Sequence, residues 1–134
     1  MDFVDFELAK KLKEEGFKEQ CLAYYTNTND LYFNYSHKAG AKYSDCYLSH
    51  NLMPKDSVSG KFFDAPTISQ VLKWLREEKK IFILIDVRKD LSWFYEIWGI
   101  EISLHPLGCV PFQKSQSYEQ AAIAGIEYVL DNLI

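Results

Sequence analysis

The sequence has no long hydrophobic run and little cysteine. No apolar stretch approaches the roughly 18 residues of a membrane-spanning helix, and residues 1–5 are acidic where a secretory signal is basic and then apolar. The cysteines, Cys21, Cys46 and Cys109, are odd in number and widely spaced, which is typical of reduced thiols rather than of a disulfide framework. We therefore expect a cytoplasmic protein that does not associate with membranes, with Cys21 as a small core residue.

Catalytic signatures are also absent, and basic charge is scarce in the C-terminal third. No G-x-S-x-G, P-loop, G-x-G-x-x-G or H-E-x-x-H motif occurs, so the sequence argues against an enzyme and indicates no cofactor. The net charge is −4, and residues 90–134 hold one lysine against six acidic residues. Because such a surface repels phosphate backbones, double-stranded DNA is not expected as a partner.

What the chain does contain is a helix-then-two-strands pattern that occurs twice, over residues 8–36 and again over residues 71–103. The segment LKEE of the first copy corresponds to LREE of the second, 63 residues later. The first helix is predicted to start near Asp2 or Asp5 and to stop at Gly16, which readily adopts a left-handed conformation. A hairpin with a turn at residues 27–30 follows.

The second half of the chain begins and ends with helix signals. Capping boxes formed by Thr67 with Gln70 and by Ser117 with Gln120 mark the starts of two helices. Between them, residues 81–85 are apolar on both faces, which predicts a central strand covered on both sides. A turn at Lys89-Asp90 and a strand over residues 93–103 follow.

These elements, in the order α-β-β-α-β-β-α, predict an α+β fold with two layers, in which helices cover one face of an antiparallel sheet of four or more strands. The length of 134 residues suits a single domain, 1–134. Residues 37–65 are predicted to form a long, partly ordered loop, with short strands at 41–50 and 61–63. The second face of the sheet would carry aromatic side chains that no further element covers.

The candidate binding residues are therefore aromatic: Tyr24, Tyr32, Trp93 and Tyr95. Aromatic side chains on a sheet can stack single-stranded bases. They can equally form a core or a dimer interface. The acidic C-terminal third favours protein contacts over nucleic acid.

A second constellation consists of two mirrored spacings, Cys46-x-x-x-His50 and His105-x-x-x-Cys109. Two thiolates and two imidazoles are a ligand set for tetrahedral zinc. Structural zinc sites usually hold their cysteines closer together, and the alternative is a set of ordinary core and surface residues.

Several segments together resemble a large family of small uncharacterised proteins that phages and prophages of gut Bacteroidetes encode. These segments are LAKKLKEEGFKEQCLAYY (8–25), APTISQVLKWLREE (65–78), residues 93–97 and SYEQAAIAGIEYVLDNL (117–133). The resemblance implies a mobile-element origin and a cytoplasmic product, and it implies no activity, cofactor or catalytic residue.

The leading hypothesis is a non-enzymatic protein that acts through protein contacts, including contacts with itself, by way of the aromatic sheet face and the acidic C-terminal helix. The alternative is a binder of single-stranded nucleic acid or of a small ligand through the same face. A zinc-stabilised module is the third hypothesis.

Overall fold

The computed structural model describes residues 2–33, 61–99 and 115–134, and the chain divides into two compact units. One unit comprises residues 3–66, and the other comprises residues 1–2 with residues 67–134. The described residues form three α-helices and two antiparallel sheets, as expected of an α+β protein. The expectation of a single domain stays a prediction, and each unit is described by itself.

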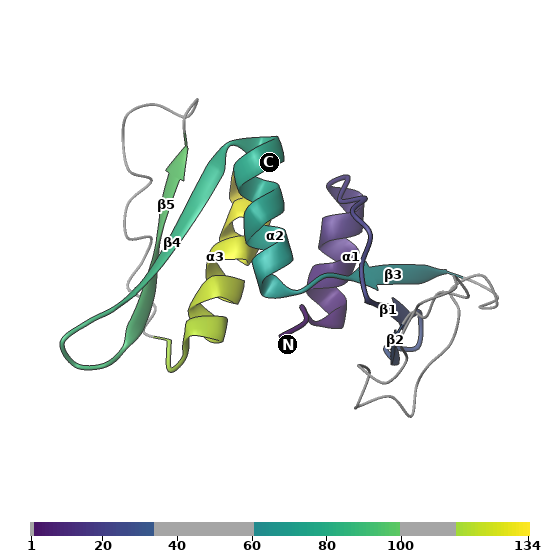
Figure 1. Cartoon of the computed structure of the whole chain (residues 1–134), viewed down its shortest axis with the longest axis horizontal. Helices are drawn as coiled ribbons and strands as arrows, with labels where there is room; N and C mark the ends of the chain where they lie inside the picture. The colour runs from purple at the N-terminus through teal and green to yellow at the C-terminus, as the bar shows by residue number, and fades with distance from the viewer. Residues whose placement is uncertain (1, 34–60, 100–114) are drawn as a thin grey trace, which may run out of the picture. The chain divides into compact units, whose positions relative to one another are not determined.

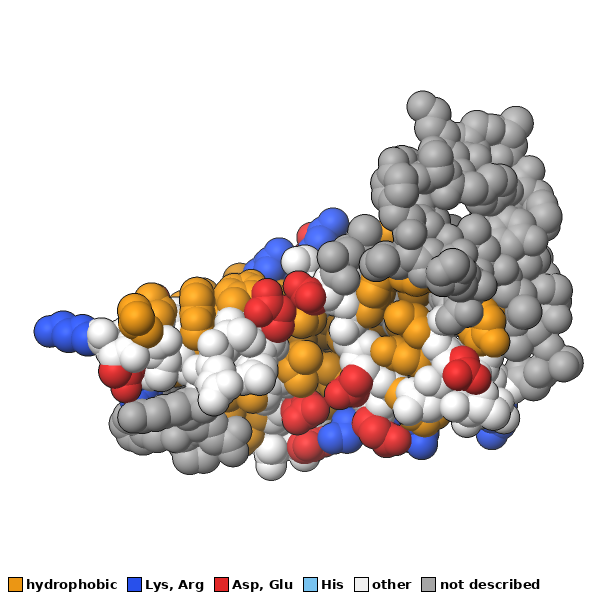
Figure 2. Space-filling view, turned by 90° about the horizontal axis from the view of Figure 1, so that it is seen from below, with side chains coloured by type: hydrophobic (Ala, Val, Ile, Leu, Met, Phe, Trp, Pro, Cys, Tyr) orange, Lys and Arg blue, Asp and Glu red, His pale blue; other side chains and the backbone are white. Residues whose placement is uncertain are grey.

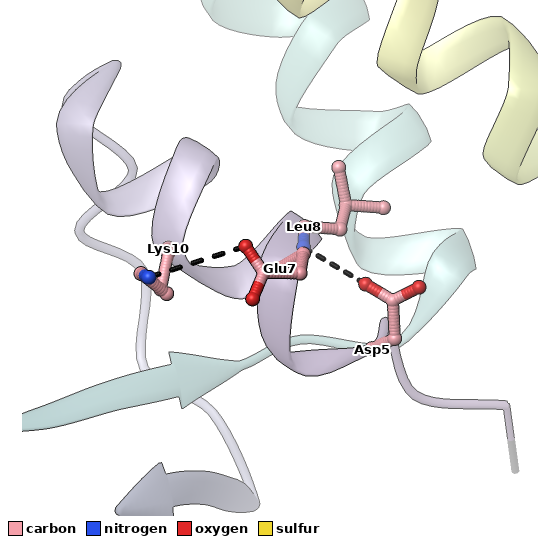
Figure 3. Close-up of polar contacts among 4 residues, drawn as sticks. All are labelled: Asp5, Glu7, Leu8 and Lys10. Atoms are coloured by element: carbon pink, nitrogen blue, oxygen red, sulfur yellow. Dashed lines mark hydrogen bonds and ion pairs between the residues drawn. The ribbon is translucent and has the colours of Figure 1, made fainter. Parts of the chain in front are cut away.

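Helix α1 (Phe6–Glu14) opens the unit of residues 3–66 and begins at one of the two predicted positions. The Oδ1 atom of Asp5 accepts a hydrogen bond of 2.8 Å from the Leu8 backbone N–H (Figure 3). This bond satisfies one of the N–H groups that the first turn of a helix leaves without a partner. On the exposed side of the same turn, Lys10 and Glu7 form an ion pair of 3.9 Å (Figure 3).

The sheet of this unit has the strand order β2-β1-β3 and is antiparallel throughout. Its strands are β1 (Ala23–Thr26), β2 (Leu31–Phe33) and β3 (Phe62–Ala65). The predicted hairpin and the short strand expected near residues 61–63 are confirmed, while residues 41–50 lie outside the described part. Gly16 has a φ of +89°, which confirms the predicted stop of the first helix. Helix α1 packs on one face of the sheet, where the Phe6 ring meets Tyr25 and Phe63 edge-on at 5.7 and 5.6 Å.

The unit of residues 1–2 and 67–134 contains the other two α-helices and a hairpin. Its elements are α2 (Ile68–Trp74), the π-helical turn η3 (Leu75–Lys79), β4 (Ile81–Val87), β5 (Trp93–Gly99) and α3 (Tyr118–Asn132). Both predicted helix starts are confirmed, because Thr67 and Ser117 each accept a 3.2 Å hydrogen bond from the backbone N–H three residues ahead. The side chain of Gln120 accepts from the Gln116 N–H at 3.0 Å, one residue before the cap.

Strands β4 and β5 form an antiparallel hairpin, and α3 packs across one of its faces (Figure 1). The prediction that residues 81–85 form a central strand covered on both sides is wrong for the described residues. There, β4 pairs with β5 alone, and Leu84 is 51 % exposed. The described strands also form one sheet of three strands and one of two, rather than a single sheet of four. In the first sheet, β3 pairs with the edge of β1 that β2 leaves open. No helix of the described segments has the length and apolar character needed to cross a membrane.

Candidate functional site

The four aromatic residues that the sequence singles out lie on two different sheets. Tyr24 belongs to β1 and Tyr32 to β2, whereas Trp93 and Tyr95 belong to β5. The structure therefore does not place them on one shared platform within a single sheet.

Tyr24 and Tyr32 are directly opposite each other on neighbouring strands and form a stacked pair. Their ring centroids are 5.8 Å apart with an interplanar angle of 21°, and Phe62 meets Tyr24 edge-on at 6.0 Å. Tyr24 is completely buried, while Tyr32 is half-buried. The Tyr24 ring therefore serves the packing of the sheet, and neither of its faces is open to a nucleic-acid base.

Trp93 and Tyr95 lie on the face of the hairpin that α3 covers, which corrects the expectation that they line an uncovered face. Gly125 of α3 comes so close that a Cβ atom on it would lie 3.2 Å from Cγ of Tyr95 and 2.9 Å from Cγ2 of Ile83. Trp93 meets Tyr118, the first residue of α3, edge-on at 5.9 Å. Tyr95 is consequently buried and is a core residue.

Burial also changes the acidity of two tyrosines. Loss of water around the Tyr95 hydroxyl raises its pKa above the usual value, and the nearby Tyr128 raises it further. Burial likewise raises the pKa of Tyr25, with a smaller effect from the negative charge of Asp5, and the Tyr25 hydroxyl donates a 2.8 Å hydrogen bond to the Val4 carbonyl. Both hydroxyls therefore stay protonated at neutral pH and act as ordinary structural groups.

The opposite side of the hairpin, which we call the outer face, is where apolar side chains reach solvent. Strand register places Phe82 opposite Trp98, Leu84 opposite Glu96, and Asp86 opposite Phe94. Leu84 is 51 % and Trp98 is 42 % exposed, while both phenylalanines are half-buried. Figure 2 shows hydrophobic side chains gathered along the hairpin, at the left of the view.

Charged groups of both signs lie around these apolar side chains. The guanidinium of Arg88 sits 4.9 Å from the centroid of the Phe94 ring. The Trp98 indole N–H points to the Glu96 carboxylate, with 3.4 Å between Nε1 and Oε2. An apolar centre with a mixed polar rim is the composition of a protein-binding surface.

The metal candidates Cys46, His50, His105 and Cys109 lie outside the described residues, so the zinc site stays a prediction. Among the residues that are described, no three His, Cys, Asp or Glu side chains gather in a way that could hold a metal ion. Cys21 is buried, and its thiol donates to the Glu19 carbonyl at 3.4 Å, which confirms its expected place in the core.

The sequence contained one signal for the outer face. Alternation along β5 separates Phe94 and Trp98 from Trp93 and Tyr95, and both sets are large and apolar. The small residues of α3, which include Ala122 and Gly125, mark the helix that approaches one set closely. Alternation alone does not say which set the helix covers, and in the structure α3 covers Trp93 and Tyr95.

Comparison with known proteins yields no match to any family model, to any curated protein or to any solved structure. Function is therefore inferred from the outer face itself.

Proposed function

We propose that this protein is non-enzymatic and acts by binding protein surfaces through the outer face of the β4–β5 hairpin. The observation that carries the proposal is the exposure of Leu84 and Trp98 next to the half-buried Phe82 and Phe94. Contiguous exposed apolar groups mark interaction sites, and tryptophan is among the residues that contribute most to protein binding.

The charge of this face favours a protein over a nucleic acid. The strand positions on this face carry Asp86 and Glu96, and Arg88 lies over its Phe94 ring. A phosphate backbone would meet net negative charge there, whereas a protein partner can match both signs. Single-stranded nucleic acid or a small ligand remains the alternative occupant.

The area of the face sets how strongly it can bind. Covering the exposed parts of Leu84 and Trp98 removes roughly 200 Å² of apolar surface from water, which at about 25 cal/mol per Å² is worth about 5 kcal/mol. Association costs about 4–15 kcal/mol in lost translational and rotational freedom. The face is therefore a binding centre that needs further contacts around it.

Site-specific photocrosslinking tests the proposal. A photoreactive phenylalanine replaces Trp98, and in a control protein it replaces Leu22, which is 58 % exposed and lies in the other unit. We expect a discrete protein adduct from position 98, in purified protein or in cell extract, that disappears when Leu84→Glu is added. Equal or absent adducts from positions 98 and 22 would refute the proposal.

We also propose a mobile-element origin and a duplicated helix–hairpin unit for this chain. In support, α1 is followed by the β1–β2 hairpin, and α2 with η3 is followed by the β4–β5 hairpin. The origin rests on the resemblance of residues 8–25, 65–78, 93–97 and 117–133 to the phage and prophage proteins named above.

A further inference from the structure

Strand β4 has an edge that points away from β5, and three hydrogen bonds define it. The Arg88 N–H donates to the Ser92 carbonyl at 2.8 Å, so the main chain of Arg88 faces the β5 side. The Val87 N–H instead binds its neighbour, the Asp86 carboxylate, at 2.7 Å, and the Trp93 N–H donates to Ser115 on the far side of β5. Because antiparallel strands alternate between residues that face the partner strand and residues that face away, the main chain of every second residue of β4 points outward. The outward residues are Ile81, Ile83, Ile85 and Val87.

This edge is open and unprotected within residues 61–99 and 115–134. No other strand there pairs with β4, whereas the outer edge of β5 carries the bridge between Trp93 and Ser115. Residues 81–85 are five consecutive apolar residues without proline or charge. Natural proteins usually protect an exposed strand edge with proline or with charged residues, because an unprotected edge pairs with another strand.

We propose that β4 pairs in antiparallel fashion with β4 of a second copy of this chain, about a two-fold axis at Ile83. The inference rests on the proposed function, since the paired form would enlarge the outer face through which the protein is proposed to bind. In this register the outward main chains of residues 81, 83 and 85 meet those of the second copy and form about six hydrogen bonds.

The side chains select this register over its neighbour. With the axis at Ile83, Phe82 lies opposite Leu84 of the second copy, so apolar groups meet apolar groups, and Asp86 lies at the level of its Lys80, the residue before the strand. An axis one residue later, at Leu84, would place Asp86 opposite the Phe82 ring. Self-pairing about Ile83 thus satisfies the main chain and the side chains together.

Pairing would also supply what the outer face lacks. The two hairpins become one four-stranded sheet, and the two outer faces become continuous across it. Main-chain hydrogen bonds add to the limited apolar area of Leu84 and Trp98, and the joined face offers a protein partner twice the area. The dimer is therefore the form of the protein that binds.

Disulfide trapping tests the register. In a background with Cys21→Ala, Cys46→Ser and Cys109→Ser, one sample carries Phe82→Cys and another carries Leu84→Cys. In the proposed register, residue 82 of one copy and residue 84 of the other are opposite residues that are not hydrogen-bonded to each other. The Cα atoms of such a pair lie about 4.5 Å apart, which is within the range of a disulfide. We expect the mixed samples to form disulfide dimers at least about tenfold faster than either sample alone. In a single sample, each cysteine lies two positions away from the same cysteine of the second copy. A mixture that reacts no faster overturns the register, and faster reaction of Leu84→Cys alone places the axis one residue later.

Sedimentation velocity at tens of micromolar protein tests the pairing itself. We expect a dimer that dissociates on Ile85→Pro, since proline removes an outward N–H and leaves the bonds to β5 in place. The control Leu22→Ala, at an exposed residue of the other unit, should keep the dimer, and circular dichroism checks that both variants fold. A wild-type monomer overturns the inference even if position 98 still crosslinks to another protein, whereas a dimer without adducts from position 98 refutes only the proposed function.

Discussion

Replacing Gly125 with alanine tests the closest contact between α3 and the hairpin. A Cβ atom at this position would lie 2.9 Å from Cγ2 of Ile83 and 3.2 Å from Cγ of Tyr95. Neither atom is the mobile end of a side chain: one is on the branched carbon of isoleucine and the other is the inner carbon of an aromatic ring. The helix or the hairpin must therefore move to accommodate the added methyl group.

Two effects of opposite sign decide the result. Alanine is favoured over glycine inside a helix by about 1 kcal/mol, whereas overpacking a well-packed core costs about 1–3 kcal/mol. We expect Gly125→Ala to lower the free energy of unfolding by about 1 kcal/mol, which lowers the urea midpoint by about 0.5 M. Equilibrium urea unfolding followed by far-UV circular dichroism measures this change.

A double-mutant cycle identifies the cause. Ile83→Leu removes the branch methyl while nearly conserving volume, so Gly125→Ala should cost less in that background than in the wild type. A variant that is more stable than the wild type, as helix propensity alone would give, refutes the close approach. Equal costs in both backgrounds would show that Ile83 is not the group in contact.

Two further predictions concern the α1 cap and a buried hydroxyl. Asp5→Ala should lower the free energy of unfolding by about 1 kcal/mol because it removes the bond to the Leu8 N–H, whereas Glu7→Gln should change it by no more than about 0.5 kcal/mol because that ion pair is exposed. Equal losses in urea unfolding would contradict the cap. The pKa of Tyr95 is raised by burial, so above pH 10.0 the unfolded hydroxyl loses its proton before the folded one does, and stability falls as pH rises. Tyr95→Phe should show a smaller fall in urea unfolding across this range, and an unchanged slope would refute the assignment.

The local elements of this fold were predictable because their signals lie within a few residues of each other. The cap at Asp5, the left-handed Gly16 and the helix starts at Thr67 and Ser117 each depend on hydrogen bonds or backbone freedom inside one turn. The turn at residues 27–30 likewise follows from turn-forming residues between two apolar runs. For such features, the residues within one turn are sufficient to specify the local structure.

The sheet partners and the open surface were decided only by tertiary structure. Pairing of β3 with β1 joins residues far apart in the chain, and no local signal specifies it. The choice of the covered hairpin face was equally hidden, since both faces of β5 are rich in large apolar residues.

By itself, the sequence determined that the hairpin would carry an apolar face on each side. Which side α3 covers was decided by the close approach of Gly125 to Ile83 and Tyr95, a contact between elements about 30 to 40 residues apart. That contact buries Tyr95 and leaves Leu84 and Trp98 exposed, and so it sets the surface from which function is proposed. Packing across such a distance depends on the shapes of two assembled elements, which a pattern of alternating residues does not contain.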